Sequence, residues 1–540
     1  MLKNPTSAIA QFGRQLVVTI ARIQHANSTT GSFPKLSISA EDEAADPPSS
    51  IPFRKKRQPM IASRRPQPAP GGDKFPTKPS ADDAMLLGIK DAVHQWWNRV
   101  SPTVAERNVI SCIPYLREAA AADTSPLAQV PSAAQPGQTQ TSAEADPYGP
   151  RLWRSTMVPL SGKERSLNEF SVERVGEEVD NTLVMLHGYG AGLGFYYQNF
   201  ENLSRSQGWK LYALDWLGMG NSTRPPFKVH SKDPAEKITE AENWFIDALE
   251  EWRKIRQINK FTLLGHSLGG YLGVSYALKY PGRVNKLILA SPVGIPEDPY
   301  AVNADMPEPT ESSFLDELAV DQQTTTTAKN DQRPDAGAPK KRPYSPLLVW
   351  LWDANVSPFS FVRLTGPLGP KFASGWTSRR FNHLTPEERQ TLHDYAYSIF
   401  RQKGSGEYAM PYLLAPGAHA RRPVINRVHR IGRQVITPAT ETAPAVRETG
   451  IPVIFMYGEN DWMDVAGGLA AEEKLKQAKI KALLHGTEEE KRRENGSAKV
   501  VVVRKAGHHL YLDNPDEFNE HVRQELQETR QRTLWERSLS

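Results

Sequence analysis

The chain has 540 residues, of which 43 are Pro and only 39% are apolar. At about 150 residues per domain the length allows three or four domains, but the excess of Pro and the scarcity of apolar residues indicate one large domain with disordered segments. A net charge of +5, from 66 basic and 61 acidic residues, is too balanced to indicate nucleic-acid binding. The single cysteine, Cys112, excludes an intramolecular disulfide framework and a zinc ribbon, and we expect neither a metal nor another cofactor. No apolar run approaches the ~18 residues that span a bilayer.

The N-terminal segment is basic. It has no acid before Glu41, and Ile9, Phe12, Leu16 and Ile20 recur at helical spacing. This pattern is typical of a mitochondrial transit peptide. A basic disordered tail is the alternative.

Shifts in composition divide the rest of the chain. A Pro-, Ser- and charge-rich segment is followed by a segment with apolar periodicity and then by a polar linker. An α/β pattern comes next, and a long segment interrupts its alternation of strands and helices. The predicted segments are a targeting and disordered segment (1–82), a helical extension ending in a helix near 115–121 (83–121), a linker (122–146), the first part of the core (147–297), a disordered insert (298–343), a lid (344–450) and the second part of the core (451–540).

Short apolar runs after residue 153 predict strands that alternate with helical windows at 242–255 and 270–280. The predicted strands are 153–160, 167–175, 182–186, 210–214, 261–264, 286–290, 452–457 and 499–504. Several are continuous apolar runs, as a sheet covered on both faces requires. The fold class is therefore α/β, a mostly parallel sheet with crossover helices. A charged loop is expected at 485–497.

The pentapeptide GHSLG at residues 265–269 follows the predicted strand 261–264 and precedes a helix. This is the G-x-S-x-G pattern in its required context, a sharp strand-to-helix turn that exposes a nucleophilic serine. The glycines two residues to either side of Ser267 let neighbouring backbone approach closely. The sequence predicts Ser267 as a catalytic nucleophile.

Folds with this turn carry the acid and the base later in the chain, in the order Ser, Asp, His. Asp461 follows the strand 452–457, and Asp464 is its competitor. His508 follows the strand 499–504 directly after a glycine, with His509 as its rival. We predict Asp461 and His508 as the partners of the serine, the carboxylate fixing the imidazole tautomer.

A tetrahedral intermediate needs backbone N–H donors at its oxyanion. The tetrapeptide HGYG at residues 187–190 follows the strand 182–186. We predict the amides of Tyr189 and Leu268 as the oxyanion hole.

The predicted lid, which interrupts the alternation before the acid-bearing strand, offers two substrate signals. Residues 347–412 are rich in aromatic side chains, most of which should form the lid's own core; an acyl-binding or membrane-facing role for some is the alternative. No acid lies between Tyr408 and Thr440, where five arginines gather: Arg421, Arg422, Arg427, Arg430 and Arg433. Arg421 and Arg422 are candidates for phosphate binding, and a solvated basic face is the alternative.

Together these motifs resemble the α/β-hydrolase-domain lipid enzymes, a family that includes mitochondrial cardiolipin-specific deacylases, N-acylphosphatidylethanolamine lipases and lysophosphatidic acid acyltransferases. The resemblance extends from about Trp96 to the C-terminus, apart from the inserts. It is carried by LHGYG (186–190), ALDWLGMGNS (213–222), EWR (251–253), LGHSLGG (264–270), LKYP (278–281), GPLG (366–369) and RRP (421–423). The family's H-x-x-x-x-D signature is present as His508 to Asp513 and implies acyltransferase activity. Residues 514–517 also form a good helix start, so a structural role for Asp513 is the alternative.

The resemblance implies an α/β-hydrolase fold and a serine esterase that deacylates a glycerophospholipid at an anionic membrane. Some members of the family lack the serine and act as coactivators, whereas Ser267 is present here. With the transit-like N-terminus, the expected activity is deacylation of cardiolipin to monolysocardiolipin at the mitochondrial inner membrane. The alternatives are a lysophosphatidic acid acyltransferase, an N-acylphosphatidylethanolamine lipase, a non-catalytic lipase coactivator, and a location in the cytosol or on lipid droplets.

Overall fold

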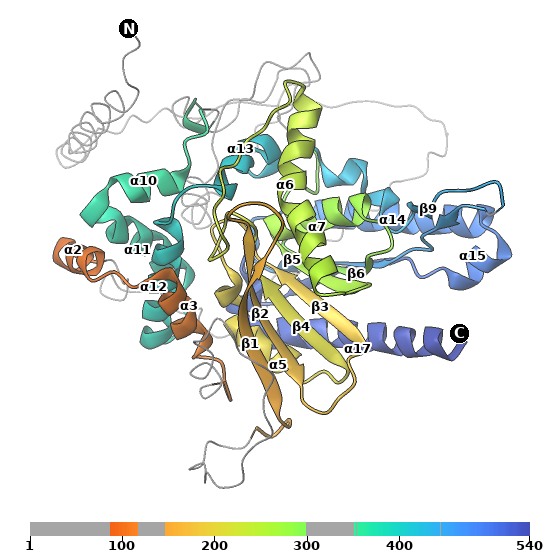
Figure 1. Ribbon diagram of the computed structural model, residues 1–540, viewed down its shortest axis with the longest axis horizontal. Coiled ribbons are helices and arrows are strands. Elements are labelled where there is room, and N and C mark those ends of the chain that lie inside the picture. The colour runs from red at the N-terminus through yellow and green to blue at the C-terminus, as the bar shows by residue number, and fades with distance from the viewer. Residues whose placement is uncertain (1–86, 117–145, 299–349, 353, 443, 540) are drawn as a thin grey trace, which may run out of the picture. The chain divides into compact units, whose positions relative to one another are not determined.

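A computed structural model describes residues 87–116, 146–298, 350–352, 354–442 and 444–539 (Figure 1). The chain divides into two units, Met1–Asp83 and Ala84–Ser540, and all described residues lie in the second. The predicted targeting segment (1–82), nearly all of the linker (122–146) and nearly all of the insert (298–343) lie outside the described residues. Among the described helices, none is long and apolar enough to cross a membrane.

The core is an eight-stranded sheet in the order β1-β2-β4-β3-β5-β6-β11-β12. Strand β2 pairs antiparallel with both neighbours, and all later pairs are parallel. The strands are β1 (Arg151–Pro159), β2 (Ser166–Arg174), β3 (Asn181–Leu186), β4 (Trp209–Leu214), β5 (Phe261–His266), β6 (Val284–Ala290), β11 (Pro452–Gly458) and β12 (Ser497–Val503). Each matches a predicted strand, which confirms the mostly parallel α/β sheet.

Successive side chains of the central strands enter opposite cores. In β3, for example, Leu183 and Met185 join one cluster, whereas Val184 and Leu186 join the other. Both faces are therefore apolar, and each is covered by helices. The first cluster packs under α5 (Tyr197–Leu203) and α17 (Pro515–Leu539), and the second under α6 (Pro234–Ile255), α7 (Leu268–Lys279) and α14 (Val465–His485) (Figure 1).

Between β6 and β11 the chain forms the lid. Its elements are α10 (Pro358–Leu364), η2 (Gly366–Leu368), α11 (Gly369–Arg380), α12 (Pro386–Phe400), η3 (Gly406–Ala409), α13 (Met410–Leu413), η4 (Val424–Asn426), η5 (Val428–Arg430) and the hairpins β7–β8 (Leu414–Ala415, His419–Ala420) and β9–β10 (Val435–Thr437, Val446–Arg447). The N-terminal extension consists of α2 (Ile89–Trp97) and α3 (Pro102–Ile110), which pack against α11 and α12 (Figure 1). The extension therefore packs against both the lid and the sheet, where α3 contacts β2 through Glu106 and Asn168.

The extension's second helix is α3, where Ser101 caps the first turn and Pro102 opens it. The helix expected near 115–121 lies mostly outside the described residues, and its first residue, Tyr115, has a positive φ of 63°. One local expectation was wrong. The expected loop at 485–497 contains α15 (Glu488–Arg493). Thr487 and Glu490 form a capping box there, which holds a short charged helix that apolar periodicity does not reveal.

Candidate active site

Ser267 occupies a strained turn between β5 and α7, with φ 52° and ψ −115°. Its N–H donates to the Ala290 carbonyl at 2.9 Å, which fixes the turn against the end of β6. A Cβ at Gly269 would lie 2.5 Å from the Leu186 carbonyl oxygen, and one at Gly265 would overlap the backbone of Gly269. The two glycines thus have the close-approach function predicted for them, and the turn has the geometry of a nucleophile elbow.

Asp461 and His508 are brought together from the loops after β11 and β12. His508 Nδ1 lies 3.2 Å from Asp461 Oδ1, and both side chains are buried. Close passage of the two loops requires Gly458, because a Cβ there would overlap the Gly507 carbonyl. Since Nδ1 faces the carboxylate, Nε2 is the ring nitrogen left to act as a base.

Two further groups hold the Asp461 carboxylate. The Met463 N–H donates to Oδ1 at 3.0 Å, and the Ser291 hydroxyl donates to Oδ2. Burial alone would raise the pKa of Asp461, but the hydrogen bonds from His508, Ser291 and Met463 hold that pKa below its ordinary value. Ser291 was not predicted from the sequence; it follows β6 immediately, and no motif distinguishes it.

The two alternative candidates, Asp464 and His509, make other contacts. Asp464 accepts the Ala466 N–H at 2.8 Å and caps helix α14 at the surface. His509 lies half-buried beside Arg380, whose Nη1 lies 2.8 Å from its Nδ1. Burial and this guanidinium lower the pKa of His509 well below its ordinary value. The geometry therefore favours Asp461 and His508.

The loop predicted to bind the oxyanion lies against the elbow. A Cβ at Gly188 would be 2.9 Å from the Ser267 Cβ, so only a glycine allows the loop to approach this closely. Leu268 is the first residue of α7, where backbone amides have no acceptor within the helix. Tyr189 follows Gly188 directly, so both predicted oxyanion residues are neighbours of Ser267.

His266, inside the pentapeptide, contacts the predicted base, His508. Its Nε2 lies 3.0 Å from the His508 carbonyl oxygen, and the two rings lie 4.8 Å apart between centroids. Burial lowers the pKa of His266 well below its ordinary value, so the ring is neutral and Nε2–H is the donor. The G-x-S-x-G pattern leaves the identity of this residue unspecified, so the role of His266 was not predicted.

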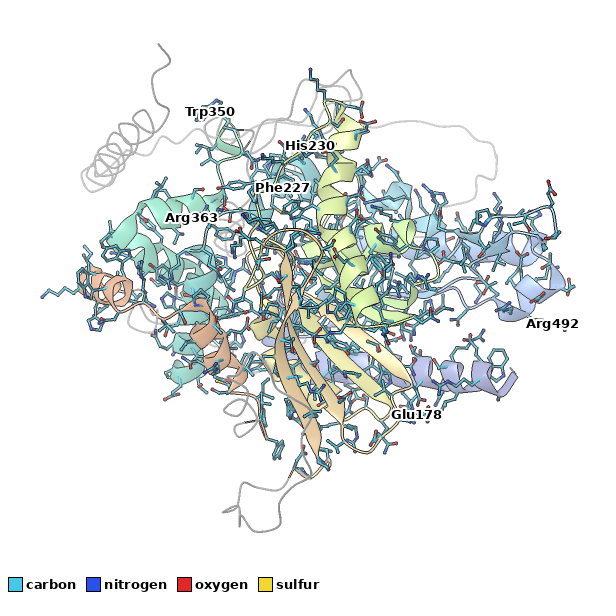
Figure 2. The ribbon with its side chains drawn as sticks, in the orientation of Figure 1. Glu178, Phe227, His230, Trp350, Arg363 and Arg492 are labelled. Carbon is cyan, nitrogen blue, oxygen red and sulfur yellow. The ribbon has the colours of Figure 1, made fainter. Side chains whose placement is uncertain are left out.

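The lid closes over this site, where Ser267 and His508 are each 7% exposed. Phe359 of α10 lies over the oxyanion loop, 5.1 Å from the Tyr189 ring and 4.8 Å from the Phe400 ring between centroids. Most aromatic side chains of the lid are buried in its core, whereas Trp350, labelled in Figure 2, is 56% exposed.

The lid arginines have internal partners. Arg422 Nη1 lies 2.9 Å from Glu242 Oε2, and Arg427 Nη2 lies 2.8 Å from Oε1 of the same buried carboxylate on α6. The Arg421 Nε donates to the Pro411 carbonyl at 2.6 Å. These contacts attach the lid to the core, so phosphate recognition by Arg421 and Arg422 gains no support from the geometry. No candidate metal cluster of His, Cys, Asp and Glu occurs among the described residues.

Asp513 holds the loop that carries the predicted base, His508. Its Oδ2 accepts the Gly507 N–H at 2.8 Å, one residue before His508. Helix α17 begins two residues later, with Asn514 Oδ1 accepting the Glu517 N–H at 3.3 Å. The observed contacts of Asp513 are thus structural.

Comparison with known proteins identifies the family of this fold. The chain matches the family described as "alpha/beta hydrolase fold" over residues 181–515, more than half of its length. The chain belongs to the α/β-hydrolase family. This α/β-hydrolase is 32% identical to "1-acylglycerol-3-phosphate O-acyltransferase" of Arabidopsis thaliana, over 71% of this chain and 75% of that protein.

Another relative of this α/β-hydrolase is the human "(Lyso)-N-acylphosphatidylethanolamine lipase", which is 29% identical over 64% of this chain and 78% of that protein. Among solved structures, naproxen esterase from Bacillus subtilis is similar with a TM-score of 0.39 and 15% identity, over 70% of this chain and 93% of that one.

Proposed function

We propose that this α/β-hydrolase is a serine acyl hydrolase that deacylates a glycerophospholipid. The observation that carries the proposal is the buried Asp461–His508 pair beside the Ser267 elbow. The names of the relatives, an acylglycerol-phosphate acyltransferase and an N-acylphosphatidylethanolamine lipase, support a phospholipid as the substrate.

In the proposed reaction Ser267 Oγ attacks the ester carbonyl and passes its proton to His508 Nε2, while Asp461 stabilises the imidazolium. The amides of Tyr189 and Leu268 bind the oxyanion. Collapse of the intermediate releases the lysolipid, whose departing oxygen takes the proton from His508. Water then hydrolyses the acyl-enzyme, with His508 as the base.

Transfer of the acyl group to a lysolipid is the second candidate. It uses the same acyl-enzyme, with a lysolipid hydroxyl in place of water, and is favoured by the name of the 32% identical relative. The competition between the two reactions depends on which acceptor reaches Ser267 under the lid.

The specific substrate that we propose is cardiolipin, converted to monolysocardiolipin at the mitochondrial inner membrane. The support is the acid-free N-terminal forty residues and the resemblance to cardiolipin-specific deacylases. A fluorescent tag on residues 1–60 tests the location. Mitochondrial fluorescence is expected, and fluorescence in the cytosol or on lipid droplets would contradict it.

Peripheral contact with an anionic membrane is part of the proposal. Helix α2 exposes Ile89, Val93 and Trp97, which lie on one face at a spacing of four residues. Helix α2 contacts the lid elements η2 and α11. These two elements and the end of α10 expose three further apolar side chains: Leu368, Phe372 and Leu364. Exposed cations stand beside both sets in the sequence: Lys90, Arg99 and Lys371. An apolar face with Trp and flanking cations is the composition of an interfacial helix.

The test incubates the purified chain with phosphatidylcholine vesicles that contain cardiolipin, phosphatidic acid or N-acylphosphatidylethanolamine, with Ser267→Ala as the control. Mass spectrometry should find monolysocardiolipin and free fatty acid only with the unaltered chain. Added lysophosphatidic acid that becomes acylated instead of releasing fatty acid would favour the acyltransferase. No Ser267-dependent product with any lipid would contradict the enzyme and favour a coactivator.

A further inference from the structure

A buried histidine, His266, lies where the loops of the candidate active site meet. It is the last residue of β5, directly before Ser267, and is 2% exposed. The predicted oxyanion loop packs against its ring, because a Cβ at Gly188 would lie 2.9 Å from Nδ1. The loop that carries the predicted base reaches the same ring, where Nε2 lies 3.0 Å from the His508 carbonyl oxygen. One side chain thus contacts both loops that neighbour the elbow.

The contact at Nε2 has a fixed direction. A carbonyl oxygen only accepts, so Nε2 of His266 carries the hydrogen and donates it to His508. Nδ1 is buried, and it has no hydrogen-bond partner among the residues that the structure describes. Since neither ring nitrogen bonds to the Ser267 hydroxyl, His266 is not placed as a second base. Its polar contact in the site is with the backbone of the base.

Neighbouring rings hold the His266 side chain in place. The ring centroids of His508, His509 and Tyr511 lie 4.8, 5.1 and 4.9 Å from its own. These three residues lie in one short segment after β12, and Tyr511 is fully buried. A ring packed this closely keeps one rotamer. Its hydrogen bond therefore fixes the His508 carbonyl relative to the end of β5.

The segment around His508 is held at two adjacent points. His266 donates to the His508 carbonyl, and Asp513 accepts the N–H of the preceding residue, Gly507, at 2.8 Å. The side chain that leaves this fixed backbone places its Nδ1 3.2 Å from Asp461 Oδ1. The orientation of the His508 imidazole thus depends on where its own carbonyl is held.

We propose that His266 is a positioning residue, whose Nε2–H holds the backbone of His508 where the imidazole can take the proton of Ser267. Its ring also supports Gly188, so the base and the oxyanion loop share one support on the strand that leads into the nucleophile. A catalytic group misplaced by about 1 Å can lower a rate about 10²-fold. The inference rests on the proposed chemistry at Ser267.

The test compares substitutions of His266 that keep or remove the donor. His266→Gln places an amide nitrogen near the position of the ring Nε2. His266→Asn places its amide nitrogen near the position of Nδ1, too far from the His508 carbonyl, and His266→Leu has no donor. The rate at which a fluorophosphonate labels Ser267 in the full chain at pH 7.5 should fall about 10- to 100-fold in His266→Leu and His266→Asn. It should fall less than about fivefold in His266→Gln.

Two measurements distinguish a positioning residue from a structural one. The intact mass after exhaustive labelling counts the competent molecules, and every folded variant should reach full occupancy. With p-nitrophenyl butyrate, kcat should fall in parallel with the labelling rate, while KM stays within about twofold, because only an interaction needed in the transition state is removed.

The matched control is His393→Leu. His393 of lid helix α12 is 1% exposed, and its ring nitrogens contact the Thr377 hydroxyl at 2.8 Å and the Gln95 amide oxygen at 3.1 Å. The substitution removes an equally buried imidazole with two polar contacts away from the catalytic loops. Its labelling rate per competent molecule should stay within about twofold of the unaltered rate.

Hydrogen–deuterium exchange gives a readout that is independent of catalysis. The amides of residues 504–513 should exchange about tenfold faster in His266→Leu than in the unaltered chain, because the loop has lost a buried hydrogen bond. In His266→Gln they should exchange at the unaltered rate. If His266→Leu does not fold, the comparison of His266→Gln with His266→Asn decides.

The outcomes separate this inference from the proposed function. Unchanged labelling in His266→Leu, equal losses in His266→Gln and His266→Asn, or lower occupancy at an unchanged rate would overturn the positioning role. Absence of labelling in the unaltered chain, with faster exchange of residues 504–513 in His266→Leu and not in His266→Gln, would instead overturn the proposed function. The support of His508 by His266 would then remain.

Discussion

Replacing Asp461 by Asn tests the assignment of the triad acid, because the amide keeps the shape of the carboxylate and removes its charge. In the proposed transition state an imidazolium forms with Nδ1 3.2 Å from Asp461 Oδ1. At an effective dielectric constant of about 20, this distance corresponds to an attraction of about 5 kcal/mol. Since each 1.4 kcal/mol changes a rate about tenfold, the kcat of Asp461→Asn should fall by about 10⁴.

Asp464→Asn is the matched control, three residues away. Asp464 caps helix α14 through the Ala466 N–H, and Asn is an equally good capping residue. Its kcat should stay within about twofold of the unaltered value. The assay is hydrolysis of p-nitrophenyl butyrate at pH 7.5, with circular dichroism to show that each variant is folded. A large loss in Asp464→Asn with little loss in Asp461→Asn would refute the assignment.

Three further substitutions probe the surroundings. Gly188→Ala places a methyl group against Ser267 and should lower kcat by about 10²–10³ through the displaced oxyanion loop; unchanged kcat would contradict that placement. Ser291→Ala removes the hydrogen bond from the Ser291 hydroxyl to the Asp461 carboxylate, and a hydrogen bond to a charged group contributes about 1.5–3 kcal/mol. Hydrolysis should therefore slow, and the pKa of Asp461, followed by NMR, should rise. An unaltered pKa would argue against the contact between Ser291 and Asp461. Glu242→Gln leaves Arg422 and Arg427 of the lid without their carboxylate. The free energy of unfolding, measured in urea, should fall by about 3–5 kcal/mol. A loss below about 1 kcal/mol would show that these two ion pairs contribute little to stability.

The sheet and the candidate triad were predictable because their signals are local. Strands such as β5 are short apolar runs between polar turns, and Ser267 lies in a pentapeptide whose glycines have a steric purpose. Asp461 and His508 each follow a strand within a few residues, and the carboxyl ends of parallel strands meet at one edge of the sheet. Sequence order therefore sufficed to bring these residues together.

The remaining features depend on contacts between distant segments. Glu242 and Arg422 are 180 residues apart. The segment around Arg422 has no acidic residue, so nothing in it indicates a carboxylate partner on another helix. Glu106 pairs with groups on β2 and α12, and its own helix shows only an ordinary amphipathic pattern. Such partners become visible only when tertiary packing brings the segments together.

The central claim, that Ser267 is a nucleophile activated by His508, is tested most directly by intact-mass analysis after reaction with a fluorophosphonate. We predict a single covalent adduct on Ser267, none on Ser267→Ala, and labelling of His508→Ala slowed by about 10³-fold or more. Absence of an adduct on the unaltered chain, or an equal adduct on Ser267→Ala, would contradict the account.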